Sequence, residues 1–181
     1  NKSFPVLSDI EEEMTKRILN AKNELDSVGG ITETAICGIP AGVGEPWFDS
    51  VESMLSHAMF SIPAVKAVEF GAGFDMANMK GSEANDSFMY VDGEIITKTN
   101  NNGGINGGIT NGMPMVFRLA VKPTPSIFKE QQTVDFERGE NIKINLVGRH
   151  DPAIVHRARA VVDAMTAITL ADMLTVRFGT N

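Results

Sequence analysis

The 181-residue sequence contains one cysteine, Cys37, and no apolar run that approaches the length of a membrane-spanning helix, about 20 residues. A single cysteine excludes an intramolecular disulfide framework and a multi-cysteine metal site, which favours a reducing, cytoplasmic compartment. We expect Cys37 to be a buried, inert thiol. The start of the sequence, 1–7, lacks the basic-then-apolar layout of a signal peptide. These absences predict a soluble protein without an obvious export signal.

Basic charge is also scarce, because 16 Lys and Arg residues face 23 Asp and Glu residues and leave a formal net charge of −7. A protein that binds nucleic acid or a membrane surface electrostatically would need a basic face, so neither partner is expected. Hydrophobic residues (43%) and charged residues (22%) are near the averages for globular proteins. Since no repeat and no linker divides the chain, we expect a single domain covering 1–181.

Apolar residues at helical spacing predict three helices. The first covers about 8–30 and opens at Ser8, which stands at capping-box spacing from a glutamate. The second covers about 48–62, with one apolar stripe along its length. The third covers about 151–174, with Asp151 as a favoured N-cap and a proline directly after it.

Strands are predicted by alternation and by β-branched content, at 31–37, 64–70, 113–122 and 141–147. Between them, Asp92-Gly93 separates two short apolar groups in the way of a hairpin turn. Helices alternate with strands, but hairpin signals dominate the middle of the chain. The pattern therefore favours an α+β fold, with helices packed against antiparallel sheets, over a doubly wound parallel sheet.

The densest chemical signal is the glycine and asparagine tract 100–112. Glycines allow backbone N–H groups to approach a ligand closely, and consecutive N–H groups can bind an anion. The tract matches neither of the glycine-rich nucleotide-binding fingerprints. Composition alone leaves two interpretations open, a flexible loop and a ligand site.

A second candidate site is Lys122-Pro123-Thr124-Pro125-Ser126, where two prolines restrict the backbone around a cation and two hydroxyls. Such a rigid polar turn can hold a phosphate, but it is equally compatible with an ordinary strand exit.

A third candidate is Arg149, which stands just before the predicted start of the last helix, where backbone donors favour an anion. Asp151 is either only the cap of that helix or, beside a cofactor, a proton acceptor. His150 and His156 do not share a helix face at metal-ligand spacing, and we predict no metal site.

Five segments stand in order along nearly all of the chain: Gly38–Pro46, Ala64–Gly71, Gly103–Ile109, Lys122–Ser126 and Gly148–Pro152. Together they closely resemble the C-terminal half of chorismate synthase. That family converts 5-enolpyruvylshikimate 3-phosphate to chorismate by anti-1,4 elimination of phosphate, the last step of the shikimate pathway. It is a carbon–oxygen lyase that needs reduced FMN although no net redox change occurs, and NADP is also associated with it.

The resemblance implies which residues face the flavin. The corresponding positions are Pro63, Ala64, Gly107, Lys122, Pro123, Thr124, Pro125, Ser126 and Arg149. Asp151 matches a carboxylate proposed to help deprotonate the reduced flavin. Flavin electronics would supply the difficult step, while the protein orients the flavin and the substrate and manages protons. Pro63 departs from the Asn or Gln that often stands there, so a contact through its carbonyl is kept but a bond through the side chain or the N–H is lost.

The resemblance covers only one half of the family's length. The other, N-terminal half carries two histidines proposed as proton donors, the arginines that hold the substrate phosphate, and an Arg-Ser flavin segment. His57 and His156 do not lie in matching motifs. The first residue, Asn1, is not methionine, and we interpret the chain as a fragment that is inactive alone.

The family's fold, helices packed between antiparallel sheets, is compatible with the pattern above, and its members assemble as homotetramers with flavin sites near subunit contacts. Two alternatives from another class remain. One is a non-enzymatic module that binds a phosphorylated ligand through the glycine tract, and the other is a purely structural assembly domain.

Overall fold

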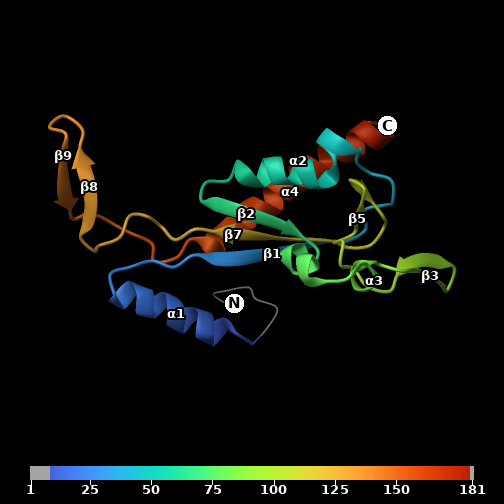
Figure 1. Cartoon of the computed structure of the whole chain (residues 1–181), viewed down its shortest axis with the longest axis horizontal. Coiled ribbons are helices and arrows are strands. Elements are labelled where there is room, and N and C mark those ends of the chain that lie inside the picture. The colour runs from blue at the N-terminus through green and yellow to red at the C-terminus, as the bar shows by residue number, and fades with distance from the viewer. Residues whose placement is uncertain (1–8, 180–181) are drawn as a thin grey trace. The chain divides into compact units, whose positions relative to one another are not determined.

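The computed structural model describes residues 9–179 of the chain (Figure 1). The chain forms two compact units. Of the described residues, unit 1 contains 9–30 and 121–158, and unit 2 contains 31–120 and 159–179. The expectation of one domain covering 1–181 stays a prediction.

Unit 2 contains most of the helices and strands. Its elements are β1 (Gly30–Ile36), η1 (Trp47–Asp49), α2 (Val51–Phe60), β2 (Val65–Phe70), η2 (Gly73–Asn78), α3 (Gly81–Ala84), β3 (Phe88–Val91), β4 (Glu94–Thr97), β5 (Ile105–Asn106), β6 (Ile109–Thr110), β7 (Met115–Val121) and α4 (Val155–Phe178). Three of them, β1, β7 and α4, have one or a few residues in unit 1.

The core of unit 2 is built on a three-stranded sheet in the order β1-β7-β2. The central strand, β7, alternates buried and half-buried residues, so that Phe117 and Leu119 point into the core. The predicted stripe of α2 is confirmed, since Val51, Leu55 and Met59 are fully buried. The same apolar cluster includes residues of α4, namely Val162, Leu170 and Met173.

Hairpins supply the antiparallel part of the fold. Strands β3 and β4 pair antiparallel across the predicted turn, with Val91 opposite Glu94. The turn residues Asp92 (φ 51°) and Gly93 (φ 92°) both have the positive φ that a type I′ turn requires. Strands β5 and β6 form a second antiparallel pair. The α+β class with antiparallel sheets is therefore confirmed.

Unit 1 contains α1 (Glu11–Asn23) and the antiparallel hairpin of β8 (Gln131–Asp135) and β9 (Glu140–Ile144). The expectation that the first helix continues to Gly29-Gly30 is wrong. Leu25 adopts a left-handed conformation (φ 61°), and the N–H groups of Leu25 and Asp26 bond back to the carbonyls of Lys22 and Ala21. This is a Schellman end with leucine where glycine is usual, so no glycine marks it in the sequence. The predicted cap Ser8 lies outside the described residues.

The last helix begins later than predicted, at Val155 instead of Asp151, and ends at Phe178. The carbonyl of Ile154 accepts the N–H groups of Arg157 and Ala158, so the first turn starts there. Asp151 is therefore not the N-cap. Its carboxylate pairs with the guanidinium of Arg157 instead.

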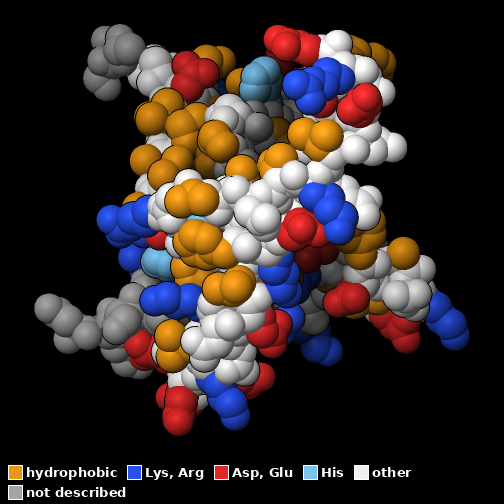
Figure 2. All heavy atoms as spheres, turned by 90° about the vertical axis from the view of Figure 1, so that its left-hand side faces the viewer, with side chains coloured by type: hydrophobic (Ala, Val, Ile, Leu, Met, Phe, Trp, Pro, Cys, Tyr) orange, Lys and Arg blue, Asp and Glu red, His pale blue; other side chains and the backbone are white. Residues whose placement is uncertain are grey.

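Cys37 is exposed, and the expectation of a buried thiol is wrong. It directly follows the last residue of β1, where the chain leaves the sheet. Large apolar side chains are exposed too, including Trp47 (83%) and Phe48 (86%) in unit 2 and Phe136 (92%) in unit 1. Figure 2 shows hydrophobic side chains, in orange, at the surface among acidic and basic ones.

Candidate functional site

The turn predicted to hold a phosphate, Lys122–Ser126, lies in unit 1 directly after β7. Lys122 and both prolines are exposed, while Thr124 and Ser126 are half-buried. The Thr124 carbonyl accepts a hydrogen bond of 2.6 Å from the Ser27 hydroxyl. The Thr124 hydroxyl oxygen Oγ1 is buried and has no hydrogen-bond partner among the described residues. This turn thus presents an exposed cation beside a buried hydroxyl that has no partner among the described residues.

The segment 149–152 also lies in unit 1. Arg149 is exposed. Asp151 forms a bidentate pair with Arg157, through oxygen–nitrogen distances of 2.9 and 3.0 Å. Such a fork fixes the orientation of the carboxylate while each oxygen keeps a lone pair for another donor. The carbonyl of Pro152 accepts the N–H of Val28 at 2.8 Å.

The structure brings these two segments together through the short stretch 25–28. Ser27 bonds to the 122–126 turn and its neighbour Val28 bonds to the 149–152 segment. Close approach is possible because glycine follows: a Cβ at Gly29 would lie 2.4 Å from the Val121 carbonyl oxygen. Sequence reasoning missed this stretch because both bonds connect residues far apart in the chain. The adjacent Gly29 and Gly30 are its one signal in the sequence, and glycines at that place are also typical of a helix end.

Three further contacts hold the same region. The Asp26 carboxylate pairs with Lys129 at 2.7 Å, and this hydrogen bond, aided by the Ser27 N–H, lowers the pKa of Asp26. The Phe128 N–H donates to the Leu25 carbonyl at 3.1 Å. The Phe128 ring meets the His150 ring edge-on, with 4.5 Å between centroids. Phe128 therefore connects the stretch 25–28 to the 149–152 segment a second time.

The other predicted site residues lie in unit 2. Pro63 and Ala64 form the turn between α2 and β2, in which the Val65 N–H bonds to the Ile62 carbonyl at 3.3 Å. Ala64 has φ +75°, which is uncommon for a residue that carries a Cβ. Positive φ at the third residue and proline at the second are the features of a type II turn.

The glycine and asparagine tract is ordered around one carboxylate that sequence reasoning missed, Asp86. It accepts hydrogen bonds from the N–H groups of Asn101 and Asn102, from the Asn102 side-chain amide and from the Thr99 hydroxyl, at 2.7 to 2.8 Å. Gly103 and Gly104 are buried. The interpretation of the tract as a flexible loop is thus replaced by a hydrogen-bonded scaffold.

Opposing influences act on the pKa of Asp86. Burial, the largest single influence, would raise it, but the hydrogen bonds from Asn102, Asn101 and Thr99 outweigh burial and lower the pKa below the ordinary 3.8. The sequence gives no local signal for this role, because the partners of Asp86 stand 13 to 16 residues further along the chain.

Gly107 lies at the exposed tip of the β5–β6 hairpin with φ +59°. A Cβ there would meet no atom within 4 Å, so the turn conformation, not space, favours glycine. Its neighbour Gly108 is buried, and a Cβ there would lie 2.7 Å from the Ser50 Cβ.

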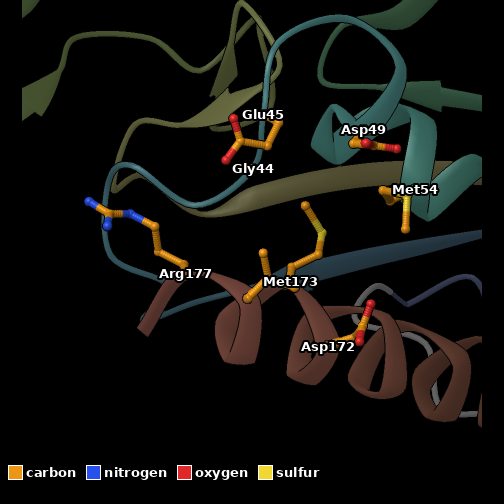
Figure 3. A pocket seen from close by; sticks show the side chains of 8 residues that line it. Gly44, Glu45, Asp49, Met54, Asp172, Met173 and Arg177 are labelled. Carbon is orange, nitrogen blue, oxygen red and sulfur yellow. The ribbon is translucent and has the colours of Figure 1, made fainter. Parts of the chain in front are cut away.

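Unit 2 also contains a cleft of about 290 Å³ beside α2 and the C-terminal turns of α4 (Figure 3). Its lining includes two methionines, three acidic residues and Arg177, whose guanidinium donates a hydrogen bond to the Gly42 carbonyl at 2.9 Å. The lining residues are Gly44, Glu45, Asp49, Met54, Asp172, Met173, Val176 and Arg177. None of the predicted site residues is among them.

Comparison with known proteins agrees with the motifs. The family model of chorismate synthase matches residues 1–175. The chain belongs to the chorismate synthase family. Chorismate synthase of Korarchaeum cryptofilum is 52% identical over 171 residues, which are 93% of this chain and 47% of the relative. Chorismate synthase of Lachnoclostridium phytofermentans is 55% identical over 153 residues, which are 84% of this chain and 41% of the relative.

A solved crystal structure of chorismate synthase matches this chain with a TM-score of 0.76 and 33% sequence identity, over 94% of this chain and 44% of the solved one. The chain therefore has a chorismate synthase fold and spans about half the length of the curated relatives it matches. Within residues 9–179, no cluster of three or more His, Cys, Asp or Glu side chains is placed to hold a metal ion. No helix in that range is long and apolar enough to cross a membrane.

Proposed function

We propose that the protein acts as a chorismate synthase, eliminating phosphate from 5-enolpyruvylshikimate 3-phosphate with the help of reduced FMN. This chain corresponds to the C-terminal half and contributes the flavin-facing residues Pro63, Ala64, Gly107, Lys122–Ser126 and Arg149, with Asp151 as a proton acceptor. One observation carries the proposal: the stretch 25–28 holds the 122–126 turn beside the 149–152 segment by two hydrogen bonds.

The residues of unit 1 fit a flavin nucleotide. FMN presents an anionic phosphate, sugar hydroxyls and an aromatic ring with polar edges. Lys122 and Arg149 are exposed cations on the two adjoining segments. The buried Thr124 hydroxyl lacks a partner that a ligand would provide. The two cations and the unpaired hydroxyl thus lie on the segments that the family resemblance associates with the flavin.

Reduced FMN supplies the electronic chemistry of the elimination when it is bound. Lys122 and Arg149 bind phosphate groups by charge-assisted hydrogen bonds. Asp151 accepts a proton at a carboxylate oxygen, and its pair with Arg157 keeps that oxygen in one orientation. The rigid prolines 123 and 125 hold the turn in place, so binding costs little ordering of the backbone.

A homotetramer and a cytoplasmic location belong to the same proposal, and so does the family's association with NADP. The tetramer is supported by exposed apolar side chains such as Trp47 and Phe48. The cytoplasmic location is supported by the single, unpaired Cys37.

Flavin titration tests the proposal. We expect saturable FMN binding to the chain, weakened about tenfold by Lys122→Ala and by Arg149→Ala, since each removes one charge-assisted contact. Lys98→Ala, which removes an exposed lysine in unit 2, is the matched control and should leave the affinity unchanged. Absence of binding, or equal affinity in all variants, would contradict the proposal.

A further inference from the structure

His150 has a polar atom that neither the fold nor the proposed function uses. Its Nε2 is buried and has no hydrogen-bond partner among the described residues. A buried imidazole nitrogen without a partner costs free energy, because its hydrogen bonds to water are lost and not replaced. Such an atom is expected to have a partner in the working protein.

The imidazole ring also contacts an aromatic neighbour. The Phe128 ring contacts it edge-on at 4.5 Å and 75° between planes, and the backbone of Phe128 is itself bonded to Leu25. The unpartnered Nε2 therefore has a fixed position next to Arg149, so it is a preorganised donor or acceptor.

A second unpartnered atom, Thr124 Oγ1, lies on the adjoining turn. One buried, neutral polar atom thus stands on each of the two segments that the stretch 25–28 holds together. The cations on those segments, Lys122 and Arg149, are exposed instead. The cations suit a phosphate, whereas the buried neutral atoms suit the edge of a heteroaromatic ring that carries both donors and acceptors.

We propose that His150 is a further ligand-binding residue of this site, whose Nε2 hydrogen-bonds to the polar edge of the flavin ring. The inference rests on the proposed function, because it takes the flavin as the ligand. Neutral imidazole either donates or accepts at Nε2, so it can meet either kind of atom on that edge. Phe128, 42% exposed beside the imidazole, adds an apolar surface for the ring system.

Titration with two ligands distinguishes a contact to the flavin ring from a contact to the phosphate. The ligands are FMN and riboflavin, which has the same ring without the phosphate. His150→Phe keeps an aromatic ring against Phe128 but removes the nitrogen. His150→Gln restores a polar group at a similar reach. Lys122→Ala serves as the phosphate-side comparison. Circular dichroism and thermal unfolding establish that each variant is folded before titration.

We expect His150→Phe to weaken the binding of FMN and of riboflavin by the same factor, about tenfold. His150→Gln should recover part of the lost affinity. Lys122→Ala should weaken the binding of FMN far more than the binding of riboflavin. Wild-type affinity of His150→Phe for both ligands would overturn the inference alone, and so would a loss confined to FMN. A wild-type chain that binds neither ligand would overturn the flavin assignment of the proposed function as well.

Discussion

At the residue scale, Asp86 holds the glycine and asparagine tract in place. One carboxylate accepts four hydrogen bonds, two of them from consecutive backbone N–H groups. The tract that follows contains Gly103, which is packed so tightly on Gly71 that a Cβ would lie 2.6 Å from the Gly71 nitrogen. Asp86 therefore fixes the approach of the chain to the β5–β6 hairpin, whose tip is Gly107.

Asp86→Asn should lower the free energy of unfolding by about 2 kcal/mol. Asparagine keeps the shape but replaces one acceptor oxygen by a donor, which then faces other donors. Urea unfolding of the purified chain measures the change. Asp75→Asn, at an exposed carboxylate of η2, is the matched control and should shift the unfolding free energy by less than about 0.5 kcal/mol. Equal effects of the two variants would contradict the role assigned to Asp86.

The stabilisation by Asp86 should also depend on pH. The folded-state pKa lies below the ordinary 3.8, so the unfolded chain takes up the proton first as pH falls. The stability difference between wild type and Asp86→Asn should be constant well above that value, and should shrink as pH falls through 3.8 toward the folded pKa. A stability difference between wild type and Asp86→Asn that grows as the pH falls would contradict a lowered folded-state pKa of Asp86.

At the scale of elements, the turn between α2 and β2 contains backbone strain that a substitution can relieve. Ala64 adopts φ +75° in a turn whose third position favours glycine. We expect Ala64→Gly to raise the free energy of unfolding by about 1 kcal/mol, since a left-handed conformation costs a Cβ-bearing residue about 1–2 kcal/mol. Ala67→Gly, inside β2, is the control and should lower stability by roughly 0.5–1 kcal/mol. Destabilisation by both variants would refute the strain at Ala64.

Elements defined by neighbours in the chain could be predicted from the sequence. The stripe of α2 and the Asp92-Gly93 hairpin depend on spacing within a few residues, and both are confirmed. The end of α1 and the start of α4 could not be predicted. The first depends on a leucine in a conformation that glycine normally takes, and the second on Asp151 binding Arg157 instead of the helix terminus.

The same distinction holds for the candidate site. The 122–126 turn and Arg149 stand out by residue type, so the sequence indicates them. Ser27, Val28 and Asp86 act through hydrogen bonds to residues distant in the chain, and their residue types alone carry no such information. Residue type predicts a buried Cys37, because most free cysteines are buried, but its position directly after the last residue of β1 exposes it.

At the scale of the whole molecule, the chain matches only about half the length of its relatives. We expect these 181 residues alone to form no chorismate with reduced FMN, because they cover less than half of the length of each of these relatives. Mixing the chain with the remaining half of a relative should restore phosphate release. The other half alone is the control. Turnover by this chain alone would contradict the expectation.

The strand order β1-β7-β2 has a consequence for the time course of synthesis. The central strand is the last of the three to be made, so β1 and β2 emerge from the ribosome without the neighbour that joins them. The apolar cluster also needs Val162, Leu170 and Met173, near the end of the chain. Unit 2 must therefore fold late, through contacts between distant residues, which is the slow route. During that interval the apolar side chains that the sheet will bury stay exposed, and transiently exposed apolar surface favours association with other chains.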